Sequence, residues 1–458
     1  MCIRDSPLLD QIWQVGVNTL YPNMSDAYSD PWRERGQWWG DAYVTDHANE
    51  AAFGDTQLLA RGLGQLAEAF GDGRPRALAP NGEGNFMLDY GMLWAQSLHD
   101  YLRRTGDTQL PARLYPALTS FLAYLAAYQN PTTGLLDIPY GNWWETTLID
   151  WAASADRYGQ STAVNALYYR TLLDAADLAA AVGDAPRAGT WRQQAGQIKA
   201  AINANLYLPA KGAYLASIAN SAPRDPTAHA QAWALANDVV PPAEQQRVAD
   251  ALVAAISPDP AAPTVEIYGM FWVLEGLGRA GRIDDANTLI KRYYGSMLDR
   301  GATTWWELFN SDRSYTSSLS HGWGSAPTWF LTSYVLGAQR TGPRDWALRP
   351  NLRALSRAAG ALPIGAGILR VAWSTPSCAQ HTLEFSAPPD TSGTLLVPFD
   401  DDATVLTLNG TIVWQNGRTL AQLAGAAPGG VQLNLSGGQF RLDIQHRCAG
   451  ATQPAALR

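Results

Sequence analysis

Apolar residues between residue 8 and about residue 341 recur with the period of an amphipathic helix. Leu9, Ile12 and Val17 show this spacing in the first segment, and residues three or four positions apart share one face of a helix. The pattern predicts about eleven helices, which short loops would join as antiparallel pairs. After the first one, helices are expected near residues 43–71, 86–105, 111–127, 160–182, 186–205, 226–237, 243–256, 266–280, 284–300 and 321–341.

Two long segments, residues 128–159 and 301–320, interrupt this pattern and are rich in tryptophan. Long loops on a rigid helical scaffold are where binding groups tend to lie. A third stretch of this kind, residues 29–41, holds three tryptophans among charged side chains. Pro31 favours a turn or an extended backbone there. We therefore expect the functional groups to lie in these three segments.

The pattern changes after Pro343. Short runs of alternating residues replace the helical period, and Asn409-Gly410 between two of them is a strong signal for a two-residue hairpin turn. The predicted fold class is mainly α, with a helical domain over residues 7–342 and a small all-β sandwich domain over residues 343–450. The alternating runs cover residues 368–373, 381–385, 394–397, 404–408, 411–414, 431–435 and 439–444.

Composition narrows the range of partners. The chain has 458 residues, of which 47% are apolar, so it can bury a large core. A net charge of −8 and only three lysines disfavour nucleic acid as a partner. No membrane span is expected, because a run of about 18 uninterrupted apolar residues is missing. Met1 to Ser6 match neither a signal peptide nor a helix start, and the sequence leaves cellular location and oligomeric state open.

Nothing in the sequence indicates a metal or a cofactor. Gly276 to Gly281 match the dinucleotide-binding fingerprint as a string, but they lie at the end of a predicted helix. Because that motif works between a strand and a helix, we interpret these glycines as a helix stop. Cys378 and Cys448 bracket one C-terminal segment. They could pair if the strands that carry them are neighbours, and free thiols are an equal alternative.

Carboxylates beside tryptophans are the strongest chemical signal. Residues 29–41 offer Asp30, Glu34 and Asp41, and aromatic faces stack on the C–H faces of a pyranose while carboxylates bind its hydroxyls. Hydrolysis of a glycosidic bond needs two carboxyl groups, one to protonate the leaving oxygen and one to activate water or attack carbon. The alternative is a structural turn on a solvated face, in which arginines pair with these carboxylates.

A second cluster lies in the segment 301–320, where Glu307 follows two tryptophans. A carboxylate packed against apolar rings has a raised pKa, which suits acid/base work near neutrality. Helix capping or an ion pair would also explain Glu307, and His321 by itself would more often be structural. The middle loop contributes Trp143, Trp144, Glu145, Asp150 and Trp151.

Three of these segments resemble the motifs of one enzyme family. Residues 31–41, Pro-Trp-Arg-Glu-Arg-Gly-Gln-Trp-Trp-Gly-Asp, resemble the acid-bearing motif of bacterial α-L-rhamnosidases, glycoside hydrolase family 78. Residues 302–307 resemble the segment that carries the general base, and residues 318–323 are similar to the histidine loop. The resemblance extends from about residue 8 to residue 445 in the family's order. Smaller matches are at residues 148–151, 326–328 and 334–337.

The resemblance implies an (α/α)6 barrel followed by a β-sandwich, and hydrolysis that inverts the anomeric configuration. Glu34 would be the general acid and Glu307 the general base that activates water, about 6.5–9.5 Å apart as in inverting enzymes. The substrate would be a rhamnoside or a rhamnose-containing glycan, with no cofactor. The residues implied to bind the sugar are Asp30, Arg33, Trp38, Trp39, Asp41, Trp94, Trp143, Trp144, Asp150, Trp151, Trp306 and His321.

Two features depart from the family. Its motif usually begins with Asp-Cys-Pro, whereas this chain has Ser29-Asp30-Pro31. The rhamnose-binding aspartate is therefore either lost to Ser29 or replaced by Asp30. Family members also carry several β domains before the barrel, and only about 28 residues precede the motif here. We therefore expect a fragment or an unusually short form.

The leading hypothesis is an inverting α-L-rhamnosidase that removes a terminal sugar from a glycoside or polysaccharide. A six-hairpin glycosidase of another sugar specificity is the nearest alternative, since a fold does not fix a function. A non-catalytic carbohydrate-binding remnant would keep the tryptophans, but the retained Glu34 and Glu307 argue against it. A polysaccharide lyase would use tyrosine, histidine and arginine or asparagine in place of two glutamates.

Overall fold

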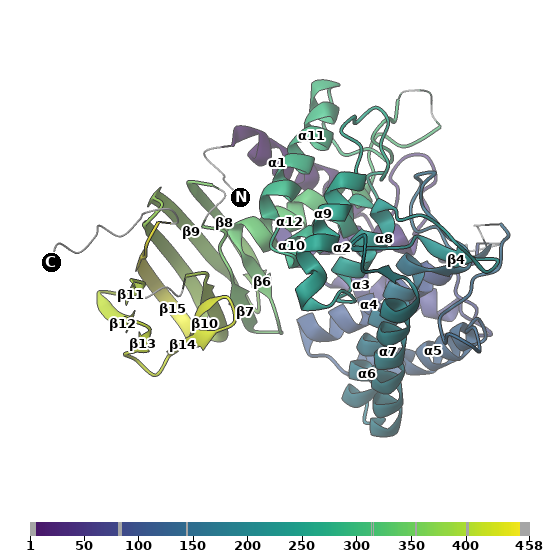
Figure 1. The fold of residues 1–458 in the computed structure, drawn as a ribbon, viewed down its shortest axis with the longest axis horizontal. Helices are drawn as coiled ribbons and strands as arrows, with labels where there is room; N and C mark the ends of the chain where they lie inside the picture. Colours follow the sequence, from purple (N-terminus) through teal and green to yellow (C-terminus); the bar gives the residue numbers. More distant parts are fainter. Residues whose placement is uncertain are drawn as a thin grey trace. The chain divides into compact units, whose positions relative to one another are not determined.

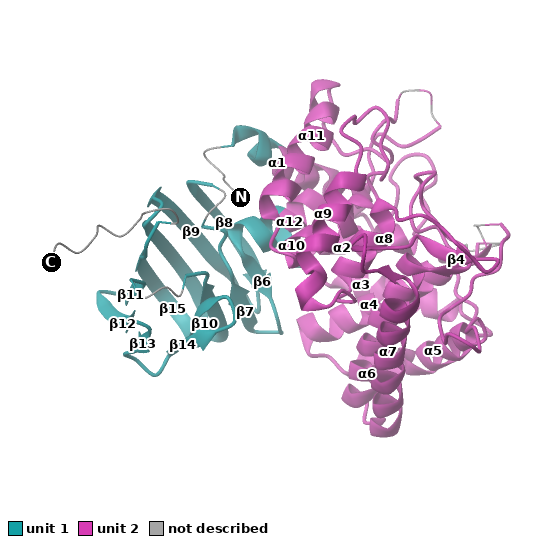
Figure 2. Cartoon of the chain, in the orientation of Figure 1, with its two compact units in different colours: residues 1–11, 51–54, 331–458 teal, residues 12–50, 55–330 magenta. Residues whose placement is uncertain are grey.

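The structure is a computed structural model that describes residues 6–80, 85–142, 145–312, 314, 316–352, 355–399 and 403–448. The chain forms two compact units, drawn in different colours in Figure 2. Residues 12–50 and 55–330 form the first, called the helical unit, and residues 1–11, 51–54 and 331–458 form the second, called the β unit. Among the described residues, no helix has the length and hydropathy that a membrane span requires.

The helices differ in how much of their surface is buried. Every residue of α8 (Ala228–Ala236) is buried, and α10 (Met270–Arg279) is buried on nearly all sides. By contrast, α7 (Ala185–Asn205) and α9 (Gln245–Ala255) bury a single stripe, as helices at the edge of a core do. The remaining helices in Figure 1 are α1 (Pro7–Asn23), α2 (Trp39–Ala52), α3 (Gln57–Glu68), α4 (Leu88–Thr105), α5 (Gln109–Ala126), α6 (Thr162–Ala181), α11 (Ile283–Asp299) and α12 (Ala326–Phe330).

Interior and edge helices alternate along the chain. α2, α4 and α6 are buried on most faces, like α8 and α10, whereas α3, α5 and α11 resemble α7 and α9 in burying one face. Neighbours in the sequence also pack together, as α6 does with α7 and α8 with α9. The expected helical domain is therefore present, with an inner and an outer layer of helices.

Two of the expected helices are wrong in part. The segment 43–71 is not one helix but α2 and α3, because Gly54 turns the chain with a left-handed φ of 71°. In the segment 321–341, α12 lies between a 3-10 turn (Gly322–Ser325) and a π-helical turn (Leu331–Leu336), and strand β6 (Ala338–Arg340) follows. A Cβ on Gly322 would lie 2.2 Å from Thr45 Oγ1, so this irregular start allows a close approach to α2.

Short strands that the sequence pattern does not reveal connect helices of the helical unit. β1 (Gln160–Ser161) pairs with β4 (Ser217–Ala219), which pairs with β5 (Ala222–Pro223). The tip of the β4–β5 hairpin has left-handed φ angles at Asn220 and Ser221, 51° and 61°. The other pair is β2 (Tyr207–Leu208) with β3 (Ala213–Tyr214).

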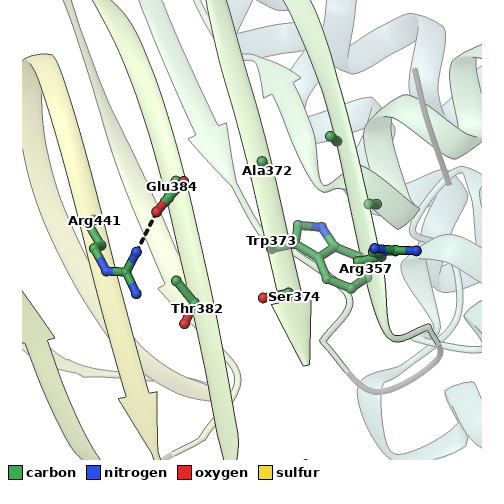
Figure 3. A pocket seen from close by; sticks show the side chains of 9 residues that line it. Arg357, Ala372, Trp373, Ser374, Thr382, Glu384 and Arg441 are labelled. Carbon is green, nitrogen blue, oxygen red and sulfur yellow. Dashed lines mark hydrogen bonds and ion pairs between the residues drawn. The ribbon is translucent and has the colours of Figure 1, made fainter. Parts of the chain in front are cut away.

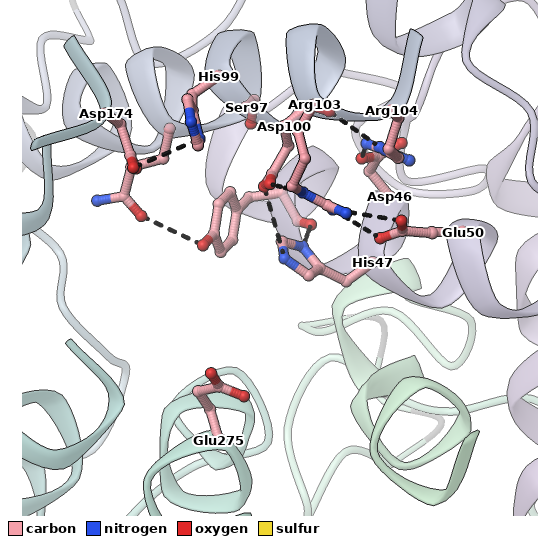
Figure 4. Close-up of polar contacts among 12 residues, drawn as sticks. Asp46, His47, Glu50, Ser97, His99, Asp100, Arg103, Arg104, Asp174 and Glu275 are labelled. Carbon is pink, nitrogen blue, oxygen red and sulfur yellow. Dashed lines mark hydrogen bonds and ion pairs between the residues drawn. The ribbon is translucent and has the colours of Figure 1, made fainter. Parts of the chain in front are cut away.

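Charged side chains gather in the second halves of the inner helices (Figure 4). Arg104 on α4 is 1% exposed and pairs with Asp46 on α2. Breaking such a buried pair leaves an uncompensated charge, so these contacts tie the inner helices to one another. Further pairs join Arg103 to Glu50 and to Asp100, at 3.2 Å each, and His99 to Asp174, at 3.4 Å.

The β unit contains a sheet whose path among the described residues is β13-β12-β11-β15-β10-β7-β6. Off this path, β14 pairs with β15, β9 pairs with β10, and β8 pairs with β9. The expected C-terminal β domain is therefore present. Its strands are β7 (Asp345–Leu348), β8 (Arg357–Ile364), β9 (Gly367–Ser377), β10 (Gln380–Val397), β11 (Val405–Leu408), β12 (Thr411–Gln415), β13 (Arg418–Thr419), β14 (Ala424–Ala427) and β15 (Gly430–Gln445).

β10 and β15 pair with each other along most of their length, and each covers two of the runs expected as separate strands. The first part of β10 also pairs with β9 and its last part with β7. Between these parts, from Ala387 to Ser392, the register shifts. Pro388 and Pro389 lie in that interval, which explains why the sequence pattern breaks there while the strand continues.

Two expectations about the β unit are decided by the structure. Asn409 and Gly410, with φ angles of 47° and 81°, join β11 to β12, so the predicted two-residue hairpin is confirmed. Cys378 and Cys448 form a disulfide with a Cα–Cα distance of 5.3 Å. The pairing alternative for these cysteines therefore holds, and the bond joins the end of β9 to the segment after β15.

One face of this sheet is hollowed (Figure 3). The hollow has a volume of about 380 Å³ and lies over β8, β9, β10 and β15. Short side chains such as Ala372 and Ser374 form its floor, while Arg441 and Glu384 form an ion pair beside it. None of the residues expected to bind a sugar lines this hollow.

Candidate active site

The described members of the predicted site all belong to the helical unit. Most come from the segment before α2 and the first turn of that helix, the loop before α6 and the segment between α11 and α12, while Trp94 lies on α4. Trp143 and Trp144 lie outside the described residues.

Asp30 shapes the first of these segments. Its Oδ1 accepts hydrogen bonds from the backbone N–H groups of Trp32 and Arg33, at 2.9 and 3.3 Å, which makes an Asx turn around Pro31. Its Oδ2 accepts the hydroxyl of Ser318, a residue of the segment that also carries Glu307. Asp30 is only 2% exposed, so this carboxylate fixes the turn from within the unit.

Arg33 joins the two glutamates that the sequence singles out. Its Nη1 lies 2.8 Å from Glu34 Oε1, and its Nη2 lies 2.9 Å from both carboxylate oxygens of Glu307. The indole N–H of Trp38 donates to Glu34 Oε2 at 2.7 Å. Charge-assisted contacts of this kind are short and directional, so both carboxylates are held in place around one guanidinium.

Glu307 is held from its other side by Ser318. The backbone N–H of Glu307 donates to the carbonyl of Ser318 at 2.9 Å, and the N–H of Ser318 donates to Glu307 Oε2 at 2.6 Å. Burial raises the pKa of the Glu307 carboxyl, while the Ser318 N–H and Arg33 oppose the rise. The net result is a raised pKa in a carboxylate with fixed geometry, which is a common property of acid/base residues.

Asp41 and His321 form a buried pair beside this group. His321 Nε2 lies 3.1 Å from Asp41 Oδ1, and the His321 ring packs 4.1 Å from that of Trp323. Burial, with the charges of Glu34 and Glu307, raises the pKa of Asp41 well above its usual value. Burial also lowers the pKa of His321 to about 4. Both shifts favour neutral side chains that share one proton across the hydrogen bond.

Asp150 occupies a different position, at the start of α10. It has no exposed surface and accepts backbone N–H bonds from Trp151, Glu266 and Gly269 at 2.9, 2.8 and 3.3 Å. His229 Nε2 lies 2.8 Å from its Oδ2. Asp150 thus fastens the loop before α6 to α8 and α10, and the structure does not place it in contact with Glu34 or Glu307.

Glu266 and Ser318 take part in this arrangement although the sequence did not single them out. Burial, with the neighbouring Asp150, raises the pKa of Glu266 to about 7. Its Oε2 accepts the N–H of Phe309 at 3.0 Å, two residues after Glu307. The available signal was a lone carboxylate at the start of an aromatic-rich helix, and Ser318 had none beyond its place in the histidine loop.

The tryptophans divide by exposure. Trp39 and Trp94 have no exposed surface, and their indole N–H groups donate to Ser97 Oγ and to the Leu63 carbonyl at 3.2 and 3.0 Å. The geometry gives these two a packing role, and direct contact with a sugar stays an untested prediction. Trp151 is 37% exposed. Trp306 is 8% exposed, with the Arg300 guanidinium 4.8 Å from its ring centroid.

Tyrosines pack beneath the start of α2. A Cβ on Gly40 would lie 2.4 Å from the Tyr90 ring and 2.7 Å from the Tyr268 hydroxyl, so only glycine fits there. Tyr90 in turn packs edge-on against Trp38, 6.3 Å between ring centroids. This packing fixes the ring whose indole N–H holds Glu34.

The same group contains a set of possible metal ligands. Asp30, Glu307 and His321 can each bring one ligand atom within 4.8 Å of the others. However, Arg33 already contacts both oxygens of Glu307, and a cation at this point would face its positive charge. The geometry therefore fits charged and hydrogen-bonded groups acting on a neutral ligand better than a metal centre.

Comparison with known proteins identifies the helical part of the chain. The model of the bacterial α-L-rhamnosidase six-hairpin glycosidase domain matches residues 3–335. A search of curated protein sequences finds no match. The family match covers well over half of the chain and includes all the site residues described above.

Several similar solved structures are α-L-rhamnosidases. The family 78 rhamnosidase of Bacillus sp. GL1 is 28% identical, with a TM-score of 0.77 over 87% of this chain and 42% of its own. The enzyme of Dictyoglumus thermophilum is 17% identical (TM-score 0.79, 97% and 50%). That of Streptomyces avermitilis, complexed with L-rhamnose, is 21% identical (TM-score 0.75, 96% and 41%).

The chain thus spans half or less of the length of these relatives. The two relatives below 25% identity show the shared fold, and the match to the family model shows membership of the family. With the motifs of residues 31–41 and 302–307 gathered around Arg33, the chain belongs to the bacterial α-L-rhamnosidase family with the six-hairpin glycosidase domain.

Proposed function

We propose that this chain hydrolyses terminal α-L-rhamnosides with inversion of the anomeric configuration. The observation that carries the proposal is Arg33, whose two terminal nitrogens lie within 2.9 Å of Glu34 on one side and Glu307 on the other. An inverting reaction needs two carboxyl groups that stand apart, by about 6.5–9.5 Å, with room for water. Two carboxylates separated by one guanidinium suit that requirement.

The two glutamates differ in ways that suit different roles. The Glu34 side chain is 35% exposed, while that of Glu307 is 8% exposed. We assign Glu34 as the general acid, which gives its proton to the leaving oxygen as the C1–O bond breaks. Glu307 is the general base, which takes a proton from the water whose oxygen forms the new bond to C1. The raised pKa of Glu307 makes its carboxylate a stronger base than that of an ordinary glutamate.

The neighbouring groups would bind and orient the sugar. Arg33 and Asp41 lie next to the two glutamates, and neutral His321 can exchange hydrogen bonds with hydroxyl groups. Asp30 replaces the aspartate that the family usually has one residue earlier, since its carboxylate reaches Ser318 beside Glu307. Support for rhamnose as the sugar comes from the family and from the relative that was solved with L-rhamnose bound.

The same proposal covers the architecture in more detail. We infer that the alternating inner and outer helices close into an (α/α)6 barrel, because each inner helix is followed by an outer one along the chain. We further infer that the sheet of the β unit folds into a sandwich, because the two parts of β10 have different neighbours. The domains would be residues 7–342 and 343–450.

The test is hydrolysis of p-nitrophenyl α-L-rhamnopyranoside, with other p-nitrophenyl sugars in parallel. The proteins compared are the wild type, Glu34→Gln, Glu307→Gln and the control Glu68→Gln, which changes an exposed glutamate at the end of α3. The proposal predicts losses on the order of 10²-fold or more for the first two variants only. Cleavage of another sugar would keep the mechanism and change the substrate, and a folded protein without any turnover would favour a binding remnant.

A further inference from the structure

A second hollow in the helical unit lies between the loop before α6 and the β4–β5 hairpin. Its volume is about 360 Å³, at the lower end of the roughly 300–1,000 Å³ typical of small-molecule sites. We propose that it binds a neutral pyranose unit, in a part of an oligosaccharide substrate that is not itself cleaved. This inference rests on the proposed function and names its substrate class, a neutral oligosaccharide rather than a small aryl glycoside.

An exposed aromatic pair forms one wall of the hollow. Tyr140 is 87% exposed, the most exposed large apolar side chain among the described residues. Its ring lies 4.7 Å from that of Tyr158, tilted by 50°, and the Tyr158 hydroxyl donates to the Gly141 carbonyl at 2.6 Å. Tyr158 therefore fixes the backbone next to Tyr140. The Tyr140 ring stays exposed to solvent, as a ring that stacks on a sugar must be.

Polar groups with fixed positions line the rest of the hollow. Asp137 accepts hydrogen bonds from the side chains of Asn130 and Gln160 at 3.1 and 3.3 Å. Asp156 accepts the hydroxyl of Ser217 at 2.6 Å. These hydrogen bonds fix the positions of the two carboxylates. Specific binding of hydroxyl groups needs a few polar groups in such fixed positions.

The charge of the lining selects among sugars. Asp137, Asp156 and Asp225 line the hollow together with a single arginine, Arg224, so negative charge exceeds positive charge. A uronic acid would be repelled by this balance, whereas a neutral sugar can donate its hydroxyls to the carboxylates. The chemistry therefore favours a neutral pyranose.

Two chain segments connect the hollow to the surroundings of Asp150, a residue that the resemblance assigns to the sugar-binding site. Thr227 lines the hollow and caps α8, and His229 in the first turn of that helix binds Asp150. Ser154 also lines the hollow, four residues after Asp150, and its hydroxyl donates to the Thr264 carbonyl. A saccharide that extends from the active site across this loop would meet the hollow within the same unit.

The experiment measures binding without turnover. Calorimetry on the full chain carrying Glu307→Gln compares a neutral rhamnose-terminated tetrasaccharide, its analogue with one uronic acid, and methyl α-L-rhamnoside. Tyr140→Ala is added to this background, and Tyr21→Ala, which removes another exposed tyrosine (66%), is the control. We expect Tyr140→Ala to weaken the neutral tetrasaccharide about tenfold, to leave methyl rhamnoside unchanged, and to affect the acidic analogue little because it binds weakly from the start.

The outcomes separate this inference from the proposed function. Three results would overturn the inference. The first is unchanged binding of the neutral tetrasaccharide in the Tyr140→Ala variant, and the second is an equal loss of binding for this tetrasaccharide and for methyl rhamnoside. The third is no binding of the neutral tetrasaccharide before Tyr140 is changed. If methyl rhamnoside fails to bind and no rhamnoside is hydrolysed, yet tetrasaccharide binding depends on Tyr140, the proposed function fails while the hollow remains a saccharide site.

Discussion

Arg33 and Glu307, 274 positions apart in the chain, form a contact in which one guanidinium nitrogen lies 2.9 Å from both carboxylate oxygens. The other terminal nitrogen of Arg33 binds Glu34, its neighbour in the sequence. The candidate acid and base are therefore positioned through the same side chain. This relationship makes Arg33 the residue whose change should disturb both glutamates at once.

Replacing Arg33 should lower activity and move its pH dependence. Arg33→Ala removes the positive charge that holds the pKa of Glu307 down, so the acidic limb of the kcat/KM profile should shift to higher pH. Activity at the optimum should fall on the order of 10²-fold, since the carboxylates lose their orientation. The measurement is a pH profile of kcat/KM for the rhamnoside.

Arg35→Ala is the matched control for that experiment. Arg35 lies two residues away in the same segment and is exposed, so its loss should change the profile little. Arg33→Lys keeps the charge without the planar fork and should restore the position of the acidic limb while recovering activity only in part. An unshifted profile in Arg33→Ala would contradict the role given to this residue.

The pair Ser29 and Asp30 tests which residue takes the place of the family aspartate. Asp30→Ala should lower kcat/KM on the order of 10²-fold, because it removes both the turn and the contact with Ser318. Asp30→Asn keeps an acceptor for the turn and separates the two effects. Ser29→Ala should leave activity within a few-fold of the wild type, and a larger loss from Ser29→Ala than from Asp30→Ala would reverse the assignment.

Stability should fall as the pH rises through the pKa of His99. Burial opposes the charged form, but the carboxylates of Asp174 and Asp177 outweigh it, so the pKa lies above the usual 6.5. The charged form therefore stabilises the fold fully below about pH 6.5, and this contribution is lost at higher pH. His99→Gln should remove the corresponding decline in Tm, on the order of 1–3 °C.

Thermal unfolding measured across neutral pH checks this prediction for the charged residues of Figure 4. Asp177→Asn should weaken the same decline, since Asp177 lies 3.6 Å from His99 Nε2. A wild-type decline that persists unchanged in His99→Gln would show that another group is responsible.

Glu266 should also lower stability as the pH rises, but for a different reason: the folded state favours its neutral form, whereas it favours the charged form of His99. Its pKa is raised to about 7 by burial, so the folded state binds a proton that the unfolded state releases. Stability should then decrease from about pH 4.5 to about pH 7. Glu266→Gln keeps an acceptor for the Phe309 N–H and removes this cost, so denaturant unfolding should find the variant more stable relative to the wild type at pH 8 than at pH 5. An equal difference at both pH values would contradict the raised pKa.

Much of the helical unit could be predicted from periodicity. The segments expected at 160–182, 186–205 and 284–300 match α6, α7 and α11 within a few residues, because an amphipathic stripe continues as long as the helix does. The same signal fails at Gly54, where the period runs on while the backbone turns. It fails again near residue 322, where glycines allow close approach and irregular turns replace a helix.

The strands show the converse error. Pro388-Pro389 and Gly437-Gly438 interrupt the alternating pattern, so each long strand was expected as two short ones. Ladder pairing between β10 and β15 resumes after the irregularity. Pairing partners lie far apart in the sequence, and local pattern does not contain them.

For the site, the residue types in the tryptophan-rich segments were informative and their distances were not. Arg33, Glu34 and Glu307 could be singled out by residue type as candidate catalytic and binding groups. That the Arg33 guanidinium joins the two glutamates is visible only in the fold, which brings together residues 274 positions apart. Ser318 and Glu266 act through backbone and long-range contacts, which the local sequence pattern does not specify. Trp94 shows the converse: the sequence analysis named it as a sugar-binding residue, and in the fold its side chain is completely buried.

The most direct test of the central claim is the configuration of the first sugar released. Proton NMR, recorded before mutarotation, should show the β-anomer of L-rhamnose appearing first from p-nitrophenyl α-L-rhamnopyranoside, with the signal absent in Glu34→Gln and Glu307→Gln. That result is predicted if Glu307 activates water on the face opposite the leaving group. Release of the α-anomer first, or undiminished release by either variant, would contradict the assignment of the two glutamates.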